Sequence, residues 1–301
     1  MNTKKLIGGL LGVVGLIGVA LLVYAAVVNC PAAGCLGTTV IPNGADTVNG
    51  SAADDTIYAD NADGNAGCDS AGRNDLVRGN AGDDEIYGCL GNDTINGGAG
   101  DDTIEGNEGN DRLFGDAGAD QIDGGAGNDF IDGGAGDDVV RGGAGNDVVR
   151  GGAGDDEVGG GAGNDRLLGD AGDDIIGDDD NSSSCDPGEE AGNDIIDGGP
   201  GDDFICGGDG NDTINGGDGN DTIDDGAGSD IIYGGPGDDD ITLVADGVRD
   251  RVFAGPGDDT INFPISGGAG PDYIDCGPGN DEVNLNGNTG ITTVNCETVN
   301  P

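Results

Sequence analysis

The sequence predicts an all-β fold in which short parallel strands stack as the successive coils of one solenoid. The pattern Gly-x-Asp-x-Φ, in which Φ is Ile, Val or Leu, occurs 20 times from Gly82 to Val283. The first eleven copies, with glycines from Gly82 to Gly172, follow one another every nine residues without a slip. A fixed period of this kind is the sequence signature of a repeat architecture, in which each repeat packs on its neighbours.

Each nine-residue repeat divides into a turn and a short strand. The three residues around Φ, as in Thr94–Asn96, have a strand-like composition, and the six before them are rich in Gly, which readily adopts positive φ. Such short strands form two parallel sheets if successive repeats alternate between the sheets, so that two repeats make one coil. The Φ side chains then point inward from both sheets. About 11 to 12 coils would give a body of roughly 55 Å.

The N-terminal segment, residues 1–28, has the composition of an export signal or a membrane anchor. Lys4 and Lys5 precede an uncharged apolar stretch from Leu6 to Val28. This order is typical of a cleaved signal peptide, but the stretch is also long enough for one hydrophobic helix to span a ~30 Å hydrocarbon core. Both alternatives stay open, and either one places the rest of the chain outside the cytoplasm.

The rest of the chain is divided by its repeats. We assign residues 29–43 to a linker, 44–284 to the solenoid, and 285–301, which lacks the motif, to a C-terminal cap. Three intervals between successive repeat aspartates are twenty residues long and predict loops with eleven extra residues each. These loops are Ala59 to Gly72, Asp178 to Ala191 and Leu243 to Ala254. The acidic loop at 178–191 is a candidate recognition site, with a plain solvated loop as the alternative.

Eight cysteines in a chain with an export segment suggest disulfide bonds, with scattered thiols as the alternative. Three pairs are separated by slightly more than one coil, so each could join a loop or the tail to the coil beneath it. The candidate pairs are Cys30 with Cys35, Cys68 with Cys89, Cys185 with Cys206, and Cys276 with Cys296.

The charge and composition exclude several classes of function. The chain has 60 acidic and 10 basic residues and a formal net charge of −50, which excludes nucleic acid and anionic membrane surfaces as electrostatic partners. Membrane association is therefore expected only through the N-terminal segment. The absence of His excludes Ser-His-Asp catalysis and His-ligated zinc. The segments outside the repeats are too short for a catalytic domain, so the sequence predicts that the protein is not an enzyme.

The segment Gly-Gly-Ala-Gly-Asp-Asp-Thr-Ile-Glu, at residues 97–105, is one clean copy of the full repeat Gly-Gly-x-Gly-x-Asp-x-Φ-x. These repeats resemble the hemolysin-type, or RTX, calcium-binding nonapeptide repeats over about 44–284. The resemblance implies a parallel β-roll, which is a right-handed β-solenoid, with Ca²⁺ in its turns. Each ion would lie between two turns one coil apart. The implied pairs are Asp102 with Asp120, Asp111 with Asp129, and Asp212 with Asp230.

Calcium takes carboxylate and backbone carbonyl oxygens as ligands, and roughly 15–20 ions would fit this number of motif copies. Ala53 and Arg73 replace the fourth-position Gly before Asp55 and Asp75, so these two aspartates are left out of the predicted set. Residues at the fifth position, such as Asn110, are interpreted as turn-formers that bond the local backbone. The predicted metal ligands are the sixth-position aspartates Asp84, Asp93, Asp102, Asp111, Asp120, Asp129, Asp138, Asp147, Asp156, Asp165, Asp174, Asp194, Asp203, Asp212, Asp221, Asp230, Asp239, Asp259, Asp272 and Asp281.

Together these features predict an exported calcium-binding protein that folds on extracellular calcium into a rigid acidic rod. Its expected role is a structural or adhesion-type interaction module at the cell surface, with a protein or surface partner that the sequence does not identify. One alternative is a calcium-dependent, non-catalytic part of a secreted toxin or enzyme system. The other is a calcium-storing or mineral-binding surface protein.

Overall fold

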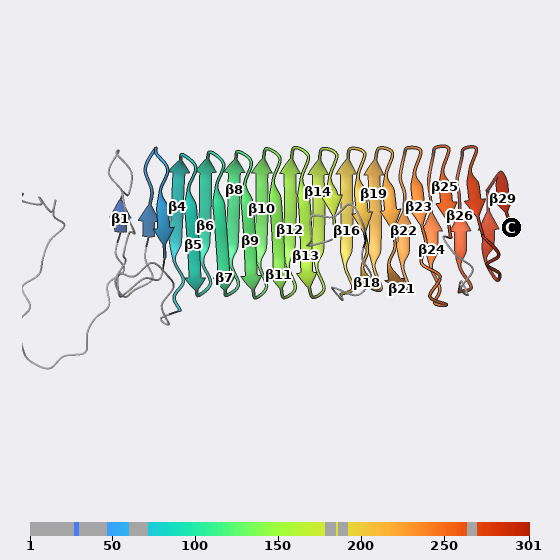
Figure 1. Ribbon diagram of the computed structural model, residues 1–301, viewed down its shortest axis with the longest axis horizontal. Coiled ribbons are helices and arrows are strands. Elements are labelled where there is room, and N and C mark those ends of the chain that lie inside the picture. Colours follow the sequence, from blue (N-terminus) through green and yellow to red (C-terminus); the bar gives the residue numbers. More distant parts are fainter. Residues whose placement is uncertain (1–26, 30–46, 60–71, 178–184, 186–191, 264–269) are drawn as a thin grey trace, which may run out of the picture.

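The computed structural model describes residues 27–29, 47–59, 72–177, 185, 192–263 and 270–301. In these ranges the chain winds back and forth between two long sheets, and the strands stack side by side along one axis (Figure 1). All pairings between neighbouring strands are parallel, as in Ile131 of β10 (Phe130–Ala135), which lies opposite Leu113 of β8 (Arg112–Ala117). The predicted parallel β-solenoid is confirmed.

The first sheet has 14 strands within the described residues. In their order across the sheet these are β1 (Val27–Asn29), β2 (Thr47–Asn49), β4 (Leu76–Ala81), β6 (Thr94–Ala99), β8, β10, β12 (Val148–Ala153), β14 (Arg166–Ala171), β16 (Ile195–Pro200), β19 (Thr213–Asp218), β22 (Ile231–Tyr233), β24 (Arg251–Phe253), β26 (Tyr273–Asp275) and β28 (Thr292–Val294).

The second sheet has 13 strands in the same part of the chain. These are β29 (Thr298–Asn300), β27 (Glu282–Asn284), β25 (Thr260–Asn262), β23 (Asp240–Thr242), β20 (Thr222–Asp224), β17 (Phe204–Cys206), β15 (Ile175–Ile176), β13 (Glu157–Ala162), β11 (Val139–Ala144), β9 (Gln121–Ala126), β7 (Thr103–Glu108), β5 (Glu85–Leu90) and β3 (Thr56–Tyr58). A further two-stranded sheet pairs β18 (Asp209–Gly210) with β21 (Ala227–Gly228).

Successive repeats alternate between the two long sheets, as predicted. Without β1 and β28 in the first sheet and β29 in the second, each sheet has 12 strands, in agreement with the predicted 11 to 12 coils. The backbone joins each coil to the next. In one example, the N–H of Phe130 donates to the carbonyl of Asp111 at 2.9 Å.

The core between the sheets contains one apolar side chain from each repeat. Because side chains alternate across a strand, the Φ residue points inward while the residues on either side of it point outward. From Ile57 to Val283 these Φ residues are almost completely buried. At the fourth position of the repeat the backbone reaches positive φ, as at Gly136 with φ 138°, where a side chain would be strained. The repeated Gly and Φ therefore have separate roles, in the turn and in the core.

The two ends of the chain extend beyond the motif. The predicted N-terminal helix lies outside the described residues except for Val27 and Val28, which belong to β1. Within the described part, no helix is long and apolar enough to cross a membrane. At the other end, the predicted cap adds one further strand to each sheet, β28 and β29.

The connections between the sheets differ between the two long edges. From the first sheet to the second, the turn from the first to the sixth position of the repeat always has six residues, from 50–55 to 276–281, and we call this the uniform edge. The six-residue strands extend into these turns. From the second sheet to the first, several connections are longer, and we call this the insertion edge. It includes β18 and β21 at the lower side of Figure 1. Before the C-terminal cap, the longer connections are 59–75, 177–194, 243–250 and 263–272.

The first two predicted insertions agree with the strand register. β2 pairs with β4 and β14 with β16 across one coil plus eleven residues. The predicted loop from Leu243 to Ala254 is wrong, because it contains strand β24, whose Val252 is buried in the core. That repeat was missed because Val248 and Arg249 precede Asp250, in place of the usual Gly-x before the aspartate.

Two predicted disulfide bonds are present. Cys185 bonds to Cys206, with 5.5 Å between their Cα atoms, and Cys276 bonds to Cys296, with 5.2 Å. The first pair joins the 177–194 connection to β17, and the second joins the C-terminal tail to the coil before it. Cys89 is also disulfide-bonded. Its predicted partner Cys68, and the predicted pair Cys30 and Cys35, lie outside the described residues.

Adjacent isoleucines in β16 test whether inward position, rather than residue type, stabilises the solenoid. Ile196 is 2% exposed and Ile195 is 48% exposed. We expect Ile196→Ala to lower the free energy of unfolding by about 2–5 kcal/mol, because it leaves a cavity in the core, and Ile195→Ala by under ~1 kcal/mol. Urea unfolding at saturating calcium measures both variants. Equal losses would contradict the assignment of the core.

Candidate metal sites

The sixth-position aspartates form one continuous ladder along each edge of the solenoid. The carboxylate Oδ1 of each aspartate accepts the backbone N–H of the corresponding aspartate one coil earlier. Asp120, for example, accepts from Asp102 at 2.7 Å, and Asp230 accepts from Asp212 at 2.8 Å. Each carboxylate is thereby held in position by the coil before it.

All 20 predicted aspartates lie in these two ladders. The uniform edge contains Asp55, Asp84, Asp102, Asp120, Asp138, Asp156, Asp174, Asp203, Asp221, Asp239, Asp259 and Asp281. The insertion edge contains Asp75, Asp93, Asp111, Asp129, Asp147, Asp165, Asp194, Asp212, Asp230, Asp250 and Asp272.

The structure brings together the pairs that the resemblance implied. Asp102 lies next to Asp120 and Asp111 next to Asp129, one coil apart. The ladders also include Asp55, Asp75 and Asp250, which the predicted set lacks. Asp250 is nine residues before Asp259 and two before a buried Val, and this spacing is the signal that could have revealed it. At the C-terminal end of the uniform edge, the N–H of Asp281 donates to Glu297 at 3.0 Å, so Glu297 continues the ladder.

The second carboxylate oxygen has no hydrogen-bond partner at most of these positions. It is buried, so water does not solvate it, and an unpartnered buried carboxylate oxygen is energetically costly. The aspartates whose Oδ2 is buried without a partner are Asp84, Asp102, Asp111, Asp120, Asp129, Asp138, Asp156, Asp174, Asp203, Asp212, Asp221, Asp225, Asp230, Asp239, Asp259, Asp272 and Asp281.

The first-position Gly keeps space open beside this oxygen. At Gly115 an added Cβ would come within 3.0 Å of both Asp120 Oδ2 and the carbonyl oxygen of Gly133. The same collision with the aspartate and with the first-position carbonyl one coil later would occur at Gly106 and Gly124. A carboxylate oxygen and a peptide carbonyl oxygen therefore border one small space in each of these turns.

Burial raises the pKa of these aspartates above the ordinary value of 3.8. The hydrogen bond from the backbone opposes this effect, while neighbouring carboxylates usually add to it. The pKa rises to about 7 at Asp84, Asp120, Asp156, Asp174, Asp212, Asp239 and Asp250, and to about 6 at Asp102, Asp111, Asp138, Asp203, Asp221, Asp230 and Asp259. The charged form of the ladder therefore requires a compensating cation.

The fifth-position residues form a second, exposed ladder, and the predicted bond to the local backbone is wrong. Asn92 Oδ1 accepts the N–H of Asn110 at 2.9 Å, and Asp83 Oδ1 accepts that of Asp101 at 3.0 Å. Both bonds reach the following coil, whereas the sixth-position carboxylates reach the preceding one. The backbone within one six-residue turn is already committed to its neighbouring coils, so the side chain bonds across the stack.

The donor set fits calcium better than zinc or copper. Carboxylate and carbonyl oxygens are what Ca²⁺ takes, in variable number and geometry, whereas Zn²⁺ and Cu⁺ favour nitrogen or sulfur ligands. The buried Oδ2 atoms, and the spaces that first-position Gly residues leave beside them, are where such an ion would receive its oxygens.

Comparison of the sequence with known protein families supports the assignment of calcium sites. The sequence matches the RTX calcium-binding nonapeptide repeat over residues 43–65, 70–104, 90–122, 105–140, 123–158, 132–167, 141–176, 190–214, 207–241, 242–263 and 265–290. The chain matches no curated protein.

Among solved structures, the chain is similar to one described as the X-ray crystal structure of a hyperactive, Ca²⁺-dependent, beta-helical antifreeze protein from an Antarctic bacterium. The two chains are 21% identical, the match covers 89% of this chain and 86% of that chain, and the TM-score is 0.32. At this TM-score nothing is inferred for this chain from that protein. The repeat matches, by contrast, cover most of the chain between residues 43 and 290, so the protein belongs to the RTX calcium-binding repeat family and binds multiple Ca²⁺ ions.

Proposed function

We propose that Ca²⁺ binds between successive coils, with the sixth-position aspartates and the first-position carbonyls as ligands, and that this binding folds the chain. The ligands would be the 20 predicted aspartates, for roughly 15–20 ions. The observation that carries the proposal is the series of buried Oδ2 atoms without a partner along both edges. A chain with a formal net charge of −50 repels itself in the compact state unless cations bind it.

The calcium concentration would decide where the chain folds. With dissociation constants of about 10⁻⁴–10⁻³ M, millimolar calcium stabilises the folded state by ~0.4–1.4 kcal/mol per site. Over about 20 sites this is roughly 8–28 kcal/mol, which matches or exceeds the ~5–15 kcal/mol stability of an ordinary domain. At cytosolic, sub-micromolar calcium this stabilisation vanishes. The chain would therefore stay unfolded before export and fold outside the cell.

We further propose that the folded rod is a structural or adhesion-type module at the cell surface. The disulfides Cys185–Cys206 and Cys276–Cys296 support export, because such bonds persist in oxidising compartments. The N-terminal segment, as a signal peptide or an anchor, would direct the chain out of the cytoplasm. A solenoid of two continuous sheets and a sequence without His support a non-catalytic role.

The first test is a calcium titration of the purified chain, followed by far-UV circular dichroism and calorimetry. We expect a cooperative transition from coil to β structure at about 0.1–1 mM calcium, with well over about ten ions bound. Substantial β structure in excess chelator at neutral pH, or only a few bound ions, would contradict the proposal that calcium folds the rod.

Single substitutions in neighbouring positions test which aspartates are ligands. Asp120 is buried in the uniform-edge ladder, whereas Asp101 is exposed at the fifth position and accepts the N–H of Ala119. Because Asn keeps the accepting oxygen but loses the charge, we expect Asp120→Asn to remove about one or two bound ions and Asp101→Asn to remove none. Calorimetric ion counts on both variants measure this. Unchanged binding in Asp120→Asn would contradict ligation by the ladder.

The pKa shifts predict how the calcium-free chain responds to pH. Many aspartates of the folded ladder, such as Asp102 and Asp120, have pKa values of about 6 to 7, against 3.8 for the ordinary carboxyl, so the folded chain binds more protons than the unfolded chain in this window. Stability without calcium should therefore be greatest below about pH 4 and fall as the pH rises towards 7. In chelator, circular dichroism should show more β structure at pH 5 than at pH 7.5. β content that increases with pH in chelator would contradict this assignment.

A further inference from the structure

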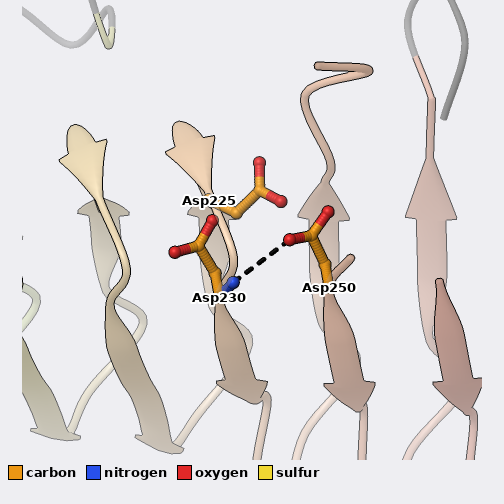
Figure 2. Close-up of side chains that lie close together, drawn as sticks. All are labelled: Asp225, Asp230 and Asp250. Carbon is orange, nitrogen blue, oxygen red and sulfur yellow. Dashed lines mark hydrogen bonds between the residues drawn. The ribbon is translucent and has the colours of Figure 1, made fainter. Parts of the chain in front are cut away.

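Three aspartate carboxylates converge at one place on the insertion edge (Figure 2). Asp225 directly follows β20, Asp230 directly precedes β22, and Asp250 directly precedes β24. One oxygen from each carboxylate lies within 4.8 Å of the other two. Two of these residues belong to the insertion-edge ladder, and Asp225 is additional to it.

Asp225 is the most enclosed of the three and is incompletely bonded. Its side chain is 0% exposed, and its Oδ1 accepts the N–H of Val244 at 2.7 Å. Its Oδ2 is buried without a hydrogen-bond partner, and so is the Oδ2 of Asp230. A buried carboxylate oxygen without a hydrogen-bond partner, Asp225 Oδ2, therefore lies in the cluster in addition to those of the ladder.

Asp225 also occupies an unusual position in the repeat. It is the first residue of the turn Asp225-Gly226-Ala227-Gly228-Ser229-Asp230, where most repeats have Gly. In the regular turns a Cβ at this position would collide with the sixth-position carboxylate of the same turn and with the first-position carbonyl one coil later, as at Gly106 and Gly124. The presence of a full side chain here requires a local change in the neighbouring coil.

That change is the longer connection one coil later. Residues 243–250 make an eight-residue turn in place of six, and Val244 from this turn is the donor to Asp225. The ladder bond from the N–H of Asp230 to Asp250 is 3.1 Å, against 2.8 Å from Asp212 to Asp230. The first position of the longer turn is Leu243, which is buried in the core. A third carboxylate thus occurs where the neighbouring turn lacks its first-position Gly.

The charges that act on the three carboxylates are negative, while Arg249 of the longer turn acts on the next ladder residue, Asp272. The ionisable groups that act on Asp225 are Asp250, Asp230 and Asp224, and the enlarged turn adds Asp246 near Asp230 and Asp250. Three ionised carboxylates this close cannot remain buried without a compensating charge. A divalent cation would supply it. A large cation with flexible coordination suits a fully protein-lined site better than Mg²⁺, which retains several waters.

We propose that Asp225, Asp230 and Asp250 form a three-carboxylate Ca²⁺ site that binds its ion more tightly than the two-carboxylate sites of the regular turns. This inference rests on the proposed calcium binding by the ladders. The added charge raises affinity, because the affinity of calcium sites depends on the number of charged ligands and on site rigidity. Asp225 supplies this third carboxylate at the place where the turn one coil later begins with Leu243 and not with Gly.

The test compares the full chain with Asp225→Asn and, as a matched control, Asp246→Asn. Asp246 is exposed, lies in the same enlarged turn and also accepts a backbone N–H, from Val248 at 2.8 Å. Both substitutions remove one charge and keep the accepting oxygen. The first measurement is anomalous scattering from crystals grown in calcium. The second is equilibrium dialysis with radioactive calcium at buffered free concentrations.

In the wild-type crystals we expect a calcium ion about 2.3–2.6 Å from carboxylate oxygens of all three residues. In solution, Asp225→Asn should weaken binding of the tightest ion about tenfold or more. Asp246→Asn should weaken it much less, because Asp246 is exposed and solvent screens its charge. Two results would overturn this inference alone and show that Asp225 is only a buried protonated acid. One is calcium in the ladder sites but none in the cluster. The other is an Asp225→Asn variant that binds its tightest ion as the wild type does. Crystals without calcium in the ladders would overturn the proposed function as well.

Discussion

The burial of like-charged carboxylates at the spacing of one coil is the constraint on which the rest of the structure depends. Parallel strands stack about 4.8 Å apart, and the aspartate of every turn repeats at that interval. Each aspartate commits Oδ1 to the backbone of the preceding coil, as Asp120 does to Asp102. The same bonds that align the coils thus bring the negative charges together, and the Ca²⁺ proposed to bind between the coils would neutralise them.

The core alone gives each coil little stabilisation. Each repeat contributes one Φ side chain, as Ile131 and Val140 do, and the outward-facing positions on either side add little burial. The turns therefore have to stabilise the fold together with the core. Two kinds of side-chain ladder cross between coils, an exposed one in which Asn92 reaches forward and a buried one in which Asp120 reaches backward. Register is fixed at the edges of the solenoid as well as in the interior.

The two edges tolerate variation to different extents. On the uniform edge the six-residue turn is repeated from residues 50–55 to 276–281, while the insertion edge has connections of several lengths. The 177–194 insertion does not interrupt the ladder, which continues across it from Asp165 to Asp194 at 2.7 Å. The disulfide Cys185–Cys206 joins one of these connections to the adjacent strand. On the insertion edge, therefore, the length of a connection can depart from that of the regular repeat while the solenoid is kept.

The sequence by itself determined the solenoid, the alternation between two sheets, the inward Φ residues and the identity of the 20 ladder aspartates, because each depends only on a residue type repeated at a fixed period. It failed at Asp250, where Val248 and Arg249 interrupt the motif although strand β24 still pairs in register. It also could not show that Asn92 bonds the next coil, or that Asp225 meets Asp230 and Asp250. These contacts join residues of different coils. Only the stacking of the coils, with turns of unequal length side by side, decided which side chains meet.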